Sequence, residues 1–440
     1  MTGYGSLPPV TNPTLTLVEG TCFAISPTAG DMRAGNLDGL YFRDTRIVSH
    51  WQLSLDGRPV DALSAQPRTP YDALFLGRRY GGEGSTLLVQ RHRMVGDGMR
   101  EDLVLRNLGS EDTACRIELR VDADFADLFS VRGGSPSPLG EVSWTYGAGT
   151  LQAEARDRNR QRGVRIRLDG ARAEAPGTLT LAVVVPARGR WEGTIQITPI
   201  VDGVAIAPAF PDDAPVSGTA PAERFRAWQL AGPVVDLSDS RLTMVLDRTL
   251  QDLGAGRVPA SGTHDGAGRG NDERDGSDGD DEDDEDSRHD TVVAAGAPWF
   301  MTLFGRDSLL AAWMAIPVDP SLALSTLRAL ADRQGSTIDP LNEEEPGRIL
   351  HEVRHGYFPL SPGSPVYYGT VDATPLFVML VGELHRWGVP PEQLAPLMPY
   401  VDRALAWIDT YGDRDGDGFV EYRRATDRGL LNQGWKDSNN

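Results

Sequence analysis

Residues 115–122 of the chain read CRIELRVD, and this short stretch decides the fold of the first half. Its apolar side chains, Cys115, Ile117, Leu119 and Val121, alternate with charged ones. A period of two is typical of a β-strand that has one buried face and one solvated face. The stretch therefore predicts a strand that packs one face against the hydrophobic core and exposes the other to solvent.

The same alternation extends outward along the first half of the sequence. It recurs in residues 164–168, VRIRL, and at Leu103 and Leu105. Turn-forming sequences separate these segments at residues 56–57, 96–98 and 107–109. Many short strands with no long helix between them favour an antiparallel β-sandwich, which we expect over residues 1–220.

After about Pro221 the apolar residues follow a helical period instead. One face is marked by Leu242, Val245, Leu246, Thr249 and Leu253, with Ser238 as a possible N-cap and Gly254 as the end. Further helices are predicted from Asp307 to before Pro317, from Asp319-Pro320 to Gly335, from Thr374-Pro375 to Gly388, and over 399–410, with a short one in 390–398. Residues 376–381 are apolar on all sides, which predicts a fully buried helix. We expect residues 221–440 to form a helical domain.

Composition and charge exclude several classes of protein. The chain has 440 residues and a net charge of −20, which makes nucleic acid or anionic lipid a poor ligand. It has no apolar run of about 18 residues and no N-terminal signal sequence, so we expect no membrane association. Two cysteines, Cys22 and Cys115, are too few for a disulfide framework. These features favour the cytoplasm.

Much of the negative charge lies in one segment. Residues 261–290 hold 13 acidic residues and 3 arginines, and their longest acidic run contains no apolar residue. Such a segment buries too little surface to offset its ordering entropy, which predicts a disordered insertion. The alternative is a tail that binds cations or a partner, but blocks of like charge are usually only solvated.

Two stretches combine aromatic residues with a charged residue at the start of a helix. Residues 298–308, PWFMTLFGRDS, place Arg306 and Asp307 directly after an aromatic run. Asp307 has an ordinary interpretation as an N-cap. Aromatic walls with a few fixed polar groups also form sugar subsites, because sugar rings have C–H faces and hydroxyl edges. Residues 367–372, YYGTVD, repeat the combination.

Two groups of residues resemble metal ligands. Asp413, Asp415 and Asp417 begin like an EF-hand loop, but position 12 is Arg424 and the acid comes early, as Glu421. A non-standard calcium site remains as a weak candidate beside a tight turn with Asx hydrogen bonds. No further ligand stands at a recognised spacing from His351, Glu352 and His355. We therefore expect these side chains to form a hydrogen-bonded polar network. We therefore predict no required metal.

The sequence NQGWKDS, residues 432–438, places an indole, an ammonium and a carboxylate side by side. An apolar ring beside Asp437 would raise the pKa of its carboxyl, which suits a general acid. The neighbouring Lys436 would lower this pKa unless its side chain points elsewhere. Two carboxylates and water suffice for acid/base hydrolysis, so no cofactor is implied.

Together these motifs resemble the bacterial glycogen debranching enzymes of the amylo-α-1,6-glucosidase type. Residues 39–46, GLYFRDTR, and 122–129, DADFADLF, resemble their N-terminal β domain. The strings PWFMTLFGRDS and NQGWKDS resemble their catalytic domain, a six-hairpin α/α barrel shared with glucoamylase-like and trehalase-like glycosidases. The resemblance covers nearly the whole chain except the acidic insertion.

The resemblance implies a role for each matching residue. Arg306 and Asp307 would hold the terminal glucose of an α-glucan or oligosaccharide substrate, and Asp437 would protonate the leaving glycosidic oxygen. The remaining substrate-binding positions would be Trp299, Phe300, Tyr367, Tyr368, Asp372 and Trp435. Inverting chemistry is implied, with a second carboxylate about 6.5–9.5 Å away that activates water.

The sequence also departs from this family. A six-hairpin barrel needs twelve helices, whereas five or six are predicted here. The glutamate expected to act as the general base, near the end of the barrel, is also absent. We therefore expect an antiparallel β-sandwich followed by an incomplete (α/α) six-hairpin toroid, with self-association through the incomplete barrel and little glycosidase activity. The alternatives are a non-catalytic carbohydrate-binding or pseudo-enzyme fragment and a calcium-regulated interaction protein.

Overall fold

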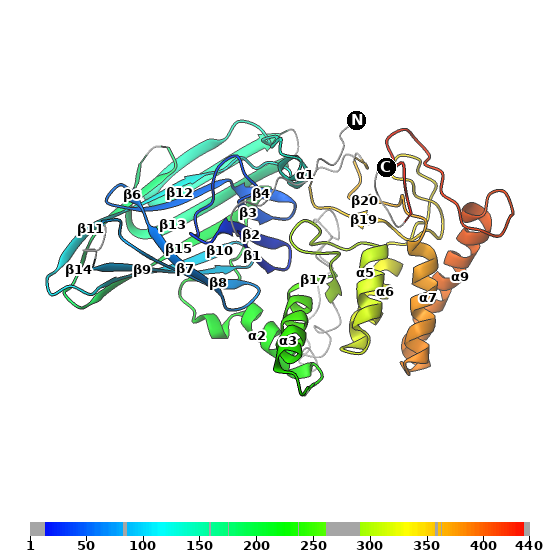
Figure 1. Cartoon of the computed structure of the whole chain (residues 1–440). Helices are drawn as coiled ribbons and strands as arrows, with labels where there is room; N and C mark the ends of the chain where they lie inside the picture. The colour runs from blue at the N-terminus through cyan, green and yellow to red at the C-terminus, as the bar shows by residue number, and fades with distance from the viewer. Residues whose placement is uncertain are drawn as a thin grey trace, which may run out of the picture. The chain divides into compact units, whose positions relative to one another are not determined.

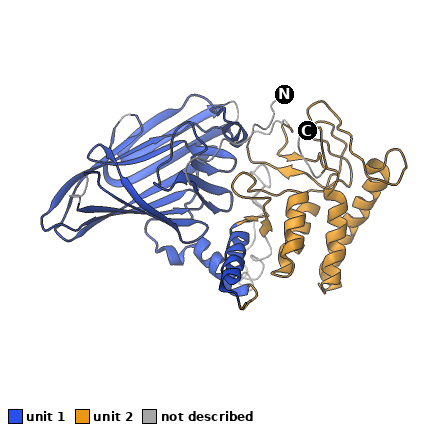
Figure 2. Ribbon diagram, in the orientation of Figure 1, with its two compact units in different colours: residues 1–231, 239–255 blue, residues 232–238, 256–440 orange. Residues whose placement is uncertain are grey.

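The computed structural model describes residues 14–81, 86–157, 160–174, 176–235, 237–260, 291–356, 360–361 and 363–434. It divides into two compact units (Figures 1 and 2). The β unit comprises residues 1–231 and 239–255, and the helical unit comprises residues 232–238 and 256–440. The predicted insertion at 261–290 lies outside the described residues.

The β unit contains two antiparallel sheets. The smaller has the order β1 (Thr14–Glu19), β2 (Cys22–Pro27), β3 (Gly39–Phe42) and β4 (Thr45–Val48). The larger has twelve described strands in the order β6-β5-β11-β14-β13-β15-β10-β9-β8-β7, with β12 beside β13 and β16 beside β15. Their bounds are β5 His50–Leu55, β6 Arg58–Pro59, β7 Asp61–Pro67, β8 Asp72–Arg78, β9 Leu87–Val95, β10 Met99–Asn107, β11 Thr113–Asp122, β12 Ser143–Asp157, β13 Arg160–Glu174, β14 Thr178–Val185, β15 Arg190–Val201 and β16 Val204–Ala205.

Two hydrophobic clusters hold these sheets together. One joins side chains of the small sheet, such as Phe42 and Val48, to side chains of the large sheet, such as Ile166 and Ile197. The other lies within the large sheet and joins β5 and β11 to β9 and β10, with Ile117 among its members. The large sheet therefore curls on itself, because strands far apart in its order share one core. The predicted antiparallel β domain is confirmed.

The alternating segments occupy the predicted strands. In β11 the residues from Cys115 to Val121 alternate between buried and more exposed positions. Ile117 lies opposite Leu55 on one side and Leu181 on the other. This strand is therefore central in its sheet. The turn predicted at residues 56–57 joins β5 to β6, and both Asp56 and Gly57 have positive φ there.

The described part of the β unit also contains three helices and a short 3-10 turn. They are α1 (Leu128–Arg132), the turn Val216–Gly218, α2 (Ala220–Ala231) and α3 (Ser240–Ala255). The indole Nε1 of Trp228 in α2 donates to the Leu250 carbonyl oxygen in α3, at 2.8 Å. These helices group with the β strands, so the compact units differ from the boundary expected at residue 220.

Helix α3 differs in two respects from its expected form. The Asp239 carboxylate, rather than the Ser238 hydroxyl, accepts the Arg241 N–H at its start. The apolar face is also not buried, since Leu242 is 57% and Val245 is 63% exposed in the described structure. Periodicity identifies an apolar face but does not supply the surface that covers it.

The helical unit contains α5 (Arg306–Ala315), α6 (Pro320–Ala331), α7 (Ala373–Arg386), α8 (Pro391–Leu394) and α9 (Met398–Trp407). A 3-10 turn at Ala395–Leu397 precedes α9, and a π-helical turn at Ile408–Gly412 follows it. The described strands of this unit form two-stranded antiparallel sheets, β17 (Arg257–Pro259) with β18 (Thr291–Val293), and β19 (Glu352–Val353) with β20 (Val366–Tyr367). The order of a β domain followed by a helical region is confirmed.

The described helices of this unit begin and end close to the predicted residues. Asp319 caps α6 by accepting the Ser321 N–H at 2.9 Å, directly before Pro320. Helix α7 was expected to be buried on all sides, but Met379 is 50% exposed. Its contacts with α5, α6 and α9 cover the face that holds Phe377 and Leu384. Since described neighbours cover only one face, the prediction of full burial is wrong.

None of the described helices is both long enough and apolar enough to cross a membrane.

Candidate functional site

The candidate site of the helical unit is built around the start of α5. The Gly305 N–H donates to the His351 carbonyl oxygen at 2.9 Å. A Cβ atom at Gly305 would lie 2.0 Å from the Leu350 carbonyl oxygen and 2.7 Å from the Ala373 Cβ. Only glycine allows this approach, which brings the start of α5 against the 350–351 segment and the start of α7.

Arg306 joins three segments that are distant in the sequence. Its side chain is 3% exposed. The Nη1 atom donates to Asp372 Oδ2 at 2.9 Å and to the Gly434 carbonyl oxygen at 2.6 Å. The Thr370 hydroxyl in turn donates to Asp372 Oδ1 at 2.8 Å. A buried guanidinium with these partners is fixed in position, because losing either acceptor would leave a charged donor poorly satisfied.

Asp307 lies in the first turn of α5 and keeps much of its carboxylate accessible. Its side chain is 45% exposed and its Oδ2 lies 3.9 Å from Arg306 Nε. Partial burial raises the pKa of this carboxyl, and the nearby Arg306 charge offsets only part of the rise. The N-cap position belongs to Gly305, so the N-cap interpretation of Asp307 is wrong. The accessible carboxylate can accept hydrogen bonds from a ligand.

The aromatic run before α5 is held by another buried arginine. The Phe300 and Phe304 rings meet edge to face, with centroids 5.8 Å apart. The guanidinium of Arg354 lies 5.9 Å and 5.2 Å from those two ring centroids, and it pairs with Glu352 at 2.7 Å. Arg354 also donates to the Trp299 carbonyl oxygen at 3.4 Å. Trp299 and Phe300 are half-buried.

Tyr367 and Tyr368 are buried, and their hydroxyls make contacts inside the unit. The Tyr367 hydroxyl accepts the Leu430 N–H at 2.9 Å, and the Tyr368 hydroxyl donates to the Arg333 carbonyl oxygen at 2.9 Å. Burial raises the pKa of both phenols. Both side chains therefore support the loops of the site in this structure.

His351 packs between aromatic rings behind the start of α5. Its ring meets Phe304 and Tyr367 edge to face at 5.7 Å and 5.9 Å. Burial lowers the pKa of this imidazole to about 3, and the charges of Arg306 and Arg354 act in the same direction. The histidine is therefore neutral at physiological pH. The neighbouring Glu352 carboxylate accepts a hydrogen bond from Arg354 Nε at 2.7 Å.

The segment that leads to the predicted general acid is held by two residues that the sequence did not single out, Glu343 and Arg348. The Gln433 side-chain amide donates to the Glu343 carboxylate, and its oxygen accepts from Arg348 Nη2 at 2.9 Å. The Gln433 carbonyl oxygen also accepts the Val371 N–H at 3.0 Å. Glu343, Arg348 and Gln433 are all buried. Together they fix the backbone immediately before Gly434.

The predicted acid Asp437 and the predicted stacking residue Trp435 lie outside the described residues. Their roles stay predictions. The last described residue of this segment, Gly434, is the one that Arg306 holds through its carbonyl oxygen. The structure therefore brings Arg306, Asp307 and Asp372 to the segment from which Asp437 follows three residues later.

The acidic loop after α9 gathers the four predicted ligands. One oxygen from each of Asp413, Asp415, Asp417 and Glu421 lies within 4.8 Å of the others. The Asp413 carboxylate also accepts the N–H groups of Gly416 and Gly418, as in a tight Asx turn. Carboxylate oxygens suit a hard cation such as Ca²⁺. The geometry accommodates both interpretations, and the calcium assignment stays a prediction.

Comparison with known families identifies the β unit. Residues 17–196 match the family model described as the N-terminal domain of (some) glycogen debranching enzymes. This range runs from β1 into β15. The chain therefore carries, over these residues, a domain from a family of carbohydrate-processing enzymes. The resemblance stated from the sequence is confirmed for this part of the chain. No curated protein sequence matches the chain.

Two solved structures show distant similarity to the chain. A protein described as "Putative kojibiose phosphorylase from human microbiome" has 9% identity and a TM-score of 0.41, with 89% of this chain and 66% of that chain covered. Heparan sulfate lyase HepC from Pedobacter heparinus has 8% identity and a TM-score of 0.26, with 48% and 44% covered. The chain thus spans slightly less than two thirds of the first of these proteins. Scores of this size carry no argument about activity.

Proposed function

We propose that the chain is part of a glycoside hydrolase of the glycogen-debranching, amylo-α-1,6-glucosidase type, which releases glucose from α-glucan branches. Two independent features support the proposal. Residues 17–196 match a domain found in some glycogen debranching enzymes. The observation that carries the proposal is Arg306, which is buried and joins the start of α5 to Asp372 and to the Gly434 carbonyl oxygen.

In this proposal each side chain has a distinct task. The Asp307 carboxylate accepts hydrogen bonds from hydroxyl groups of the terminal glucose, since it remains accessible beside a fixed cation. Arg306 orients Asp372 and the 434 segment. Trp299 and Phe300 supply aromatic surface to the C–H faces of the sugar. Trp435 stacks beside the same sugar.

Asp437 acts as the general acid. Its carboxyl gives a proton to the glycosidic oxygen while the bond from that oxygen to the anomeric carbon breaks. A water molecule attacks the anomeric carbon from the opposite face and loses its proton to a second carboxylate, so the configuration inverts. We assign no residue of this chain to that base. The linkage follows from the proposed family type, because related folds host different activities.

The test measures glucose release from a branched dextrin by the chain and by three variants. The parental rate is expected to be low, because no residue of the chain is assigned as the base. Asp437→Asn and Asp307→Asn should each lower the rate by about 10²–10⁴-fold, since each removes a carboxyl from the reaction or from substrate positioning. Asp402→Asn, at an exposed position of α9, is the matched control and should keep the parental rate. Proton NMR of the fresh product should show the β-anomer of glucose.

Two outcomes contradict the proposal. Equal rates for Asp437→Asn and the control would remove the general acid assignment. Binding of the dextrin that survives both Asp437→Asn and Asp307→Asn, with no glucose release by any of the proteins, would favour the alternative, a non-catalytic carbohydrate-binding module.

A further inference from the structure

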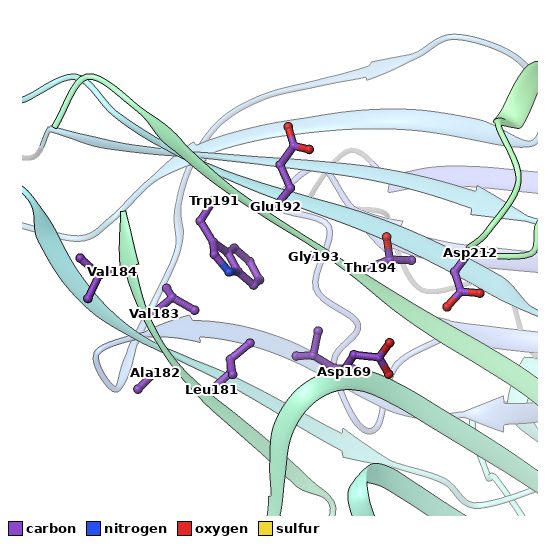
Figure 3. Close-up of a pocket in the computed structure, with 11 residues that line it drawn as sticks. Asp169, Leu181, Ala182, Val183, Val184, Trp191, Glu192, Gly193, Thr194 and Asp212 are labelled. Carbon is purple, nitrogen blue, oxygen red and sulfur yellow. The ribbon is translucent and has the colours of Figure 1, made fainter. Parts of the chain in front are cut away.

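A cavity of about 580 Å³ lies in the β unit, in a part of the large sheet where two strands separate. Strand β13 pairs with β15 as far as Leu168, and it pairs with β14 only from Arg172 onward. Gly170, with φ of +75°, lies in the crossing between these two partners. Among the described strands none is inserted between residues 181–184 of β14 and residues 191–194 of β15. The cavity occupies this space (Figure 3).

Trp191 gives the cavity an aromatic wall. The indole is half-buried and packs on one side against the hydrophobic cluster within the large sheet. A Cβ atom at Gly193 would lie 2.4 Å from the indole ring, so the ring lies across the position where a side chain would stand. Figure 3 shows the indole projecting into the space between the strands. The glycine thus allows a flat aromatic surface along β15.

Polar groups surround the indole at the open side of the cavity. Asp169 presents a carboxylate that is 80% exposed, and Asp212 presents one that pairs with Arg167. Glu192 is paired with Arg190 at 2.6 Å. The Thr194 hydroxyl donates to Asp102 and keeps its lone pairs for other donors. The lining therefore offers mainly hydrogen-bond acceptors.

These features select a neutral, hydroxyl-rich ligand. None of the eleven lining residues is basic, and the arginines beside them pair with the lining carboxylates, so the site does not favour phosphate, sulfate or carboxylate groups. All three lining carboxylates already have arginine partners, which reduces the attraction for a cation. A sugar ring fits both parts of the lining, because its C–H face stacks on an indole and its hydroxyls donate to carboxylates.

We propose that this cavity is a second carbohydrate site, which binds a segment of neutral oligosaccharide without reacting with it. The neutral-sugar assignment rests on the cavity alone, whereas its identification as α-glucan rests on the proposed function. The volume lies within the range of ordinary ligand pockets. Such a site would hold a long glucan on the protein while its ends are processed.

The test is affinity electrophoresis of the full chain in native gels that contain glycogen. The parental chain should be retarded relative to a glycogen-free gel. Trp191→Ala should weaken the apparent affinity by about tenfold or more, since it removes the stacking surface. Trp387→Ala, which removes a tryptophan that is 56% exposed at the end of α7, is the matched control and should migrate as the parent does.

A second variant guards against a simple folding defect. Gly193→Ala would push the indole away through a methyl group 2.4 Å from the ring, and it should also release the chain from glycogen. Binding by the parent should be insensitive to added salt, because a neutral ligand makes no ion pairs. Circular dichroism of each variant confirms that the fold is kept.

The outcomes separate this site from the candidate site of the helical unit. Asp307→Asn in the same gels removes the sugar contact of the helical unit, and the retardation that depends on Trp191 should persist in it. Unchanged retardation of Trp191→Ala and Gly193→Ala overturns the cavity assignment. Loss of retardation in Asp307→Asn alone also overturns the cavity assignment, but it does not contradict the proposed hydrolase function. An unretarded parental chain overturns the α-glucan site whatever the activity.

Discussion

Glu101 of the β unit and Glu343 of the helical unit are both buried glutamates, yet their pKa values shift in opposite directions. Burial alone would raise the pKa of Glu101, but the two arginines on either side of its carboxylate hold that pKa below its usual range. Burial raises the pKa of Glu343, and the single arginine nearby, Arg348, offsets only part of this effect.

The difference follows from how the two units make their contacts. Glu101 lies opposite Arg93 across the β9–β10 ladder and accepts from it at 2.6 Å and 2.8 Å, while Arg91 donates at 2.7 Å. Glu343 has φ of +60° in a loop and accepts from the neutral amide of Gln433. Regular strand pairing closes a charge network completely, whereas a loop assembled from distant segments leaves a carboxylate with incomplete compensation.

The largest expected effect is on the closed network. Glu101→Gln should lower the free energy of unfolding of the β unit by about 3–5 kcal/mol, because two buried arginines would lose their shared negative charge. Urea unfolding at neutral pH measures this value. The control is Glu118→Gln, whose partner Arg120 is 61% exposed, with an expected change below about 1 kcal/mol. Similar values for both variants would contradict the comparison.

The next effect concerns pH and the neutral histidine of the helical unit. The pKa of His351 is lowered from about 6.5 in the unfolded chain to about 3 in the folded one. Protons therefore bind the unfolded state preferentially, and the stability is present above pH 6.5 and declines as the pH falls toward 3. Acidification from pH 7 to pH 5 should therefore lower the free energy of unfolding by about 2 kcal/mol through this histidine.

The histidine prediction is checked by urea unfolding at both pH values. His351→Phe should reduce the loss by about 2 kcal/mol, since phenylalanine does not titrate. His385→Phe changes an exposed residue of α7 and should follow the parent. If His351→Phe keeps the full parental loss on acidification, the histidine is not the group responsible.

A smaller effect is expected at the second glutamate. Glu343→Gln imitates the protonated carboxyl that burial already favours, and Arg348 keeps Glu345 as a partner at 3.4 Å. The unfolding free energy of the helical unit should change by less than about 1 kcal/mol at pH 5. A loss as large as that for Glu101→Gln would show that Glu343 is a fully compensated anion after all.

The smallest effect is expected in the exposed acidic loop. Asp415→Asn should change the unfolding free energy by less than about 0.5 kcal/mol without calcium, because its carboxylate is accessible to water. Repeating the measurement in millimolar CaCl₂ tests the calcium assignment. Stabilisation of the parent but not of the variant would support a bound ion, and identical curves for both proteins would leave only the Asx turn.

The candidate site was predictable from the sequence in part. Arg306 and Asp372 each lie in a string with aromatic neighbours, and such strings are visible without a structure. Glu343 and Arg348 were missed, because Glu343 begins the acidic run 343–345 and Arg348 follows it closely, which is the pattern of a solvated loop. Only their burial beside Gln433 shows that they hold the site.

The sequence by itself determined where strands and helices form, since these signals are local. Alternation at residues 115–122 marks a strand, and Asp319 with Pro320 marks the start of a helix. Only the tertiary structure decided which side chains meet. Arg306 contacts residues 66 and 128 positions away, and the sheet places Trp191 over Gly193 beside a strand crossing. Local patterns report one apolar face, whereas contacts between distant segments depend on how all the faces pack.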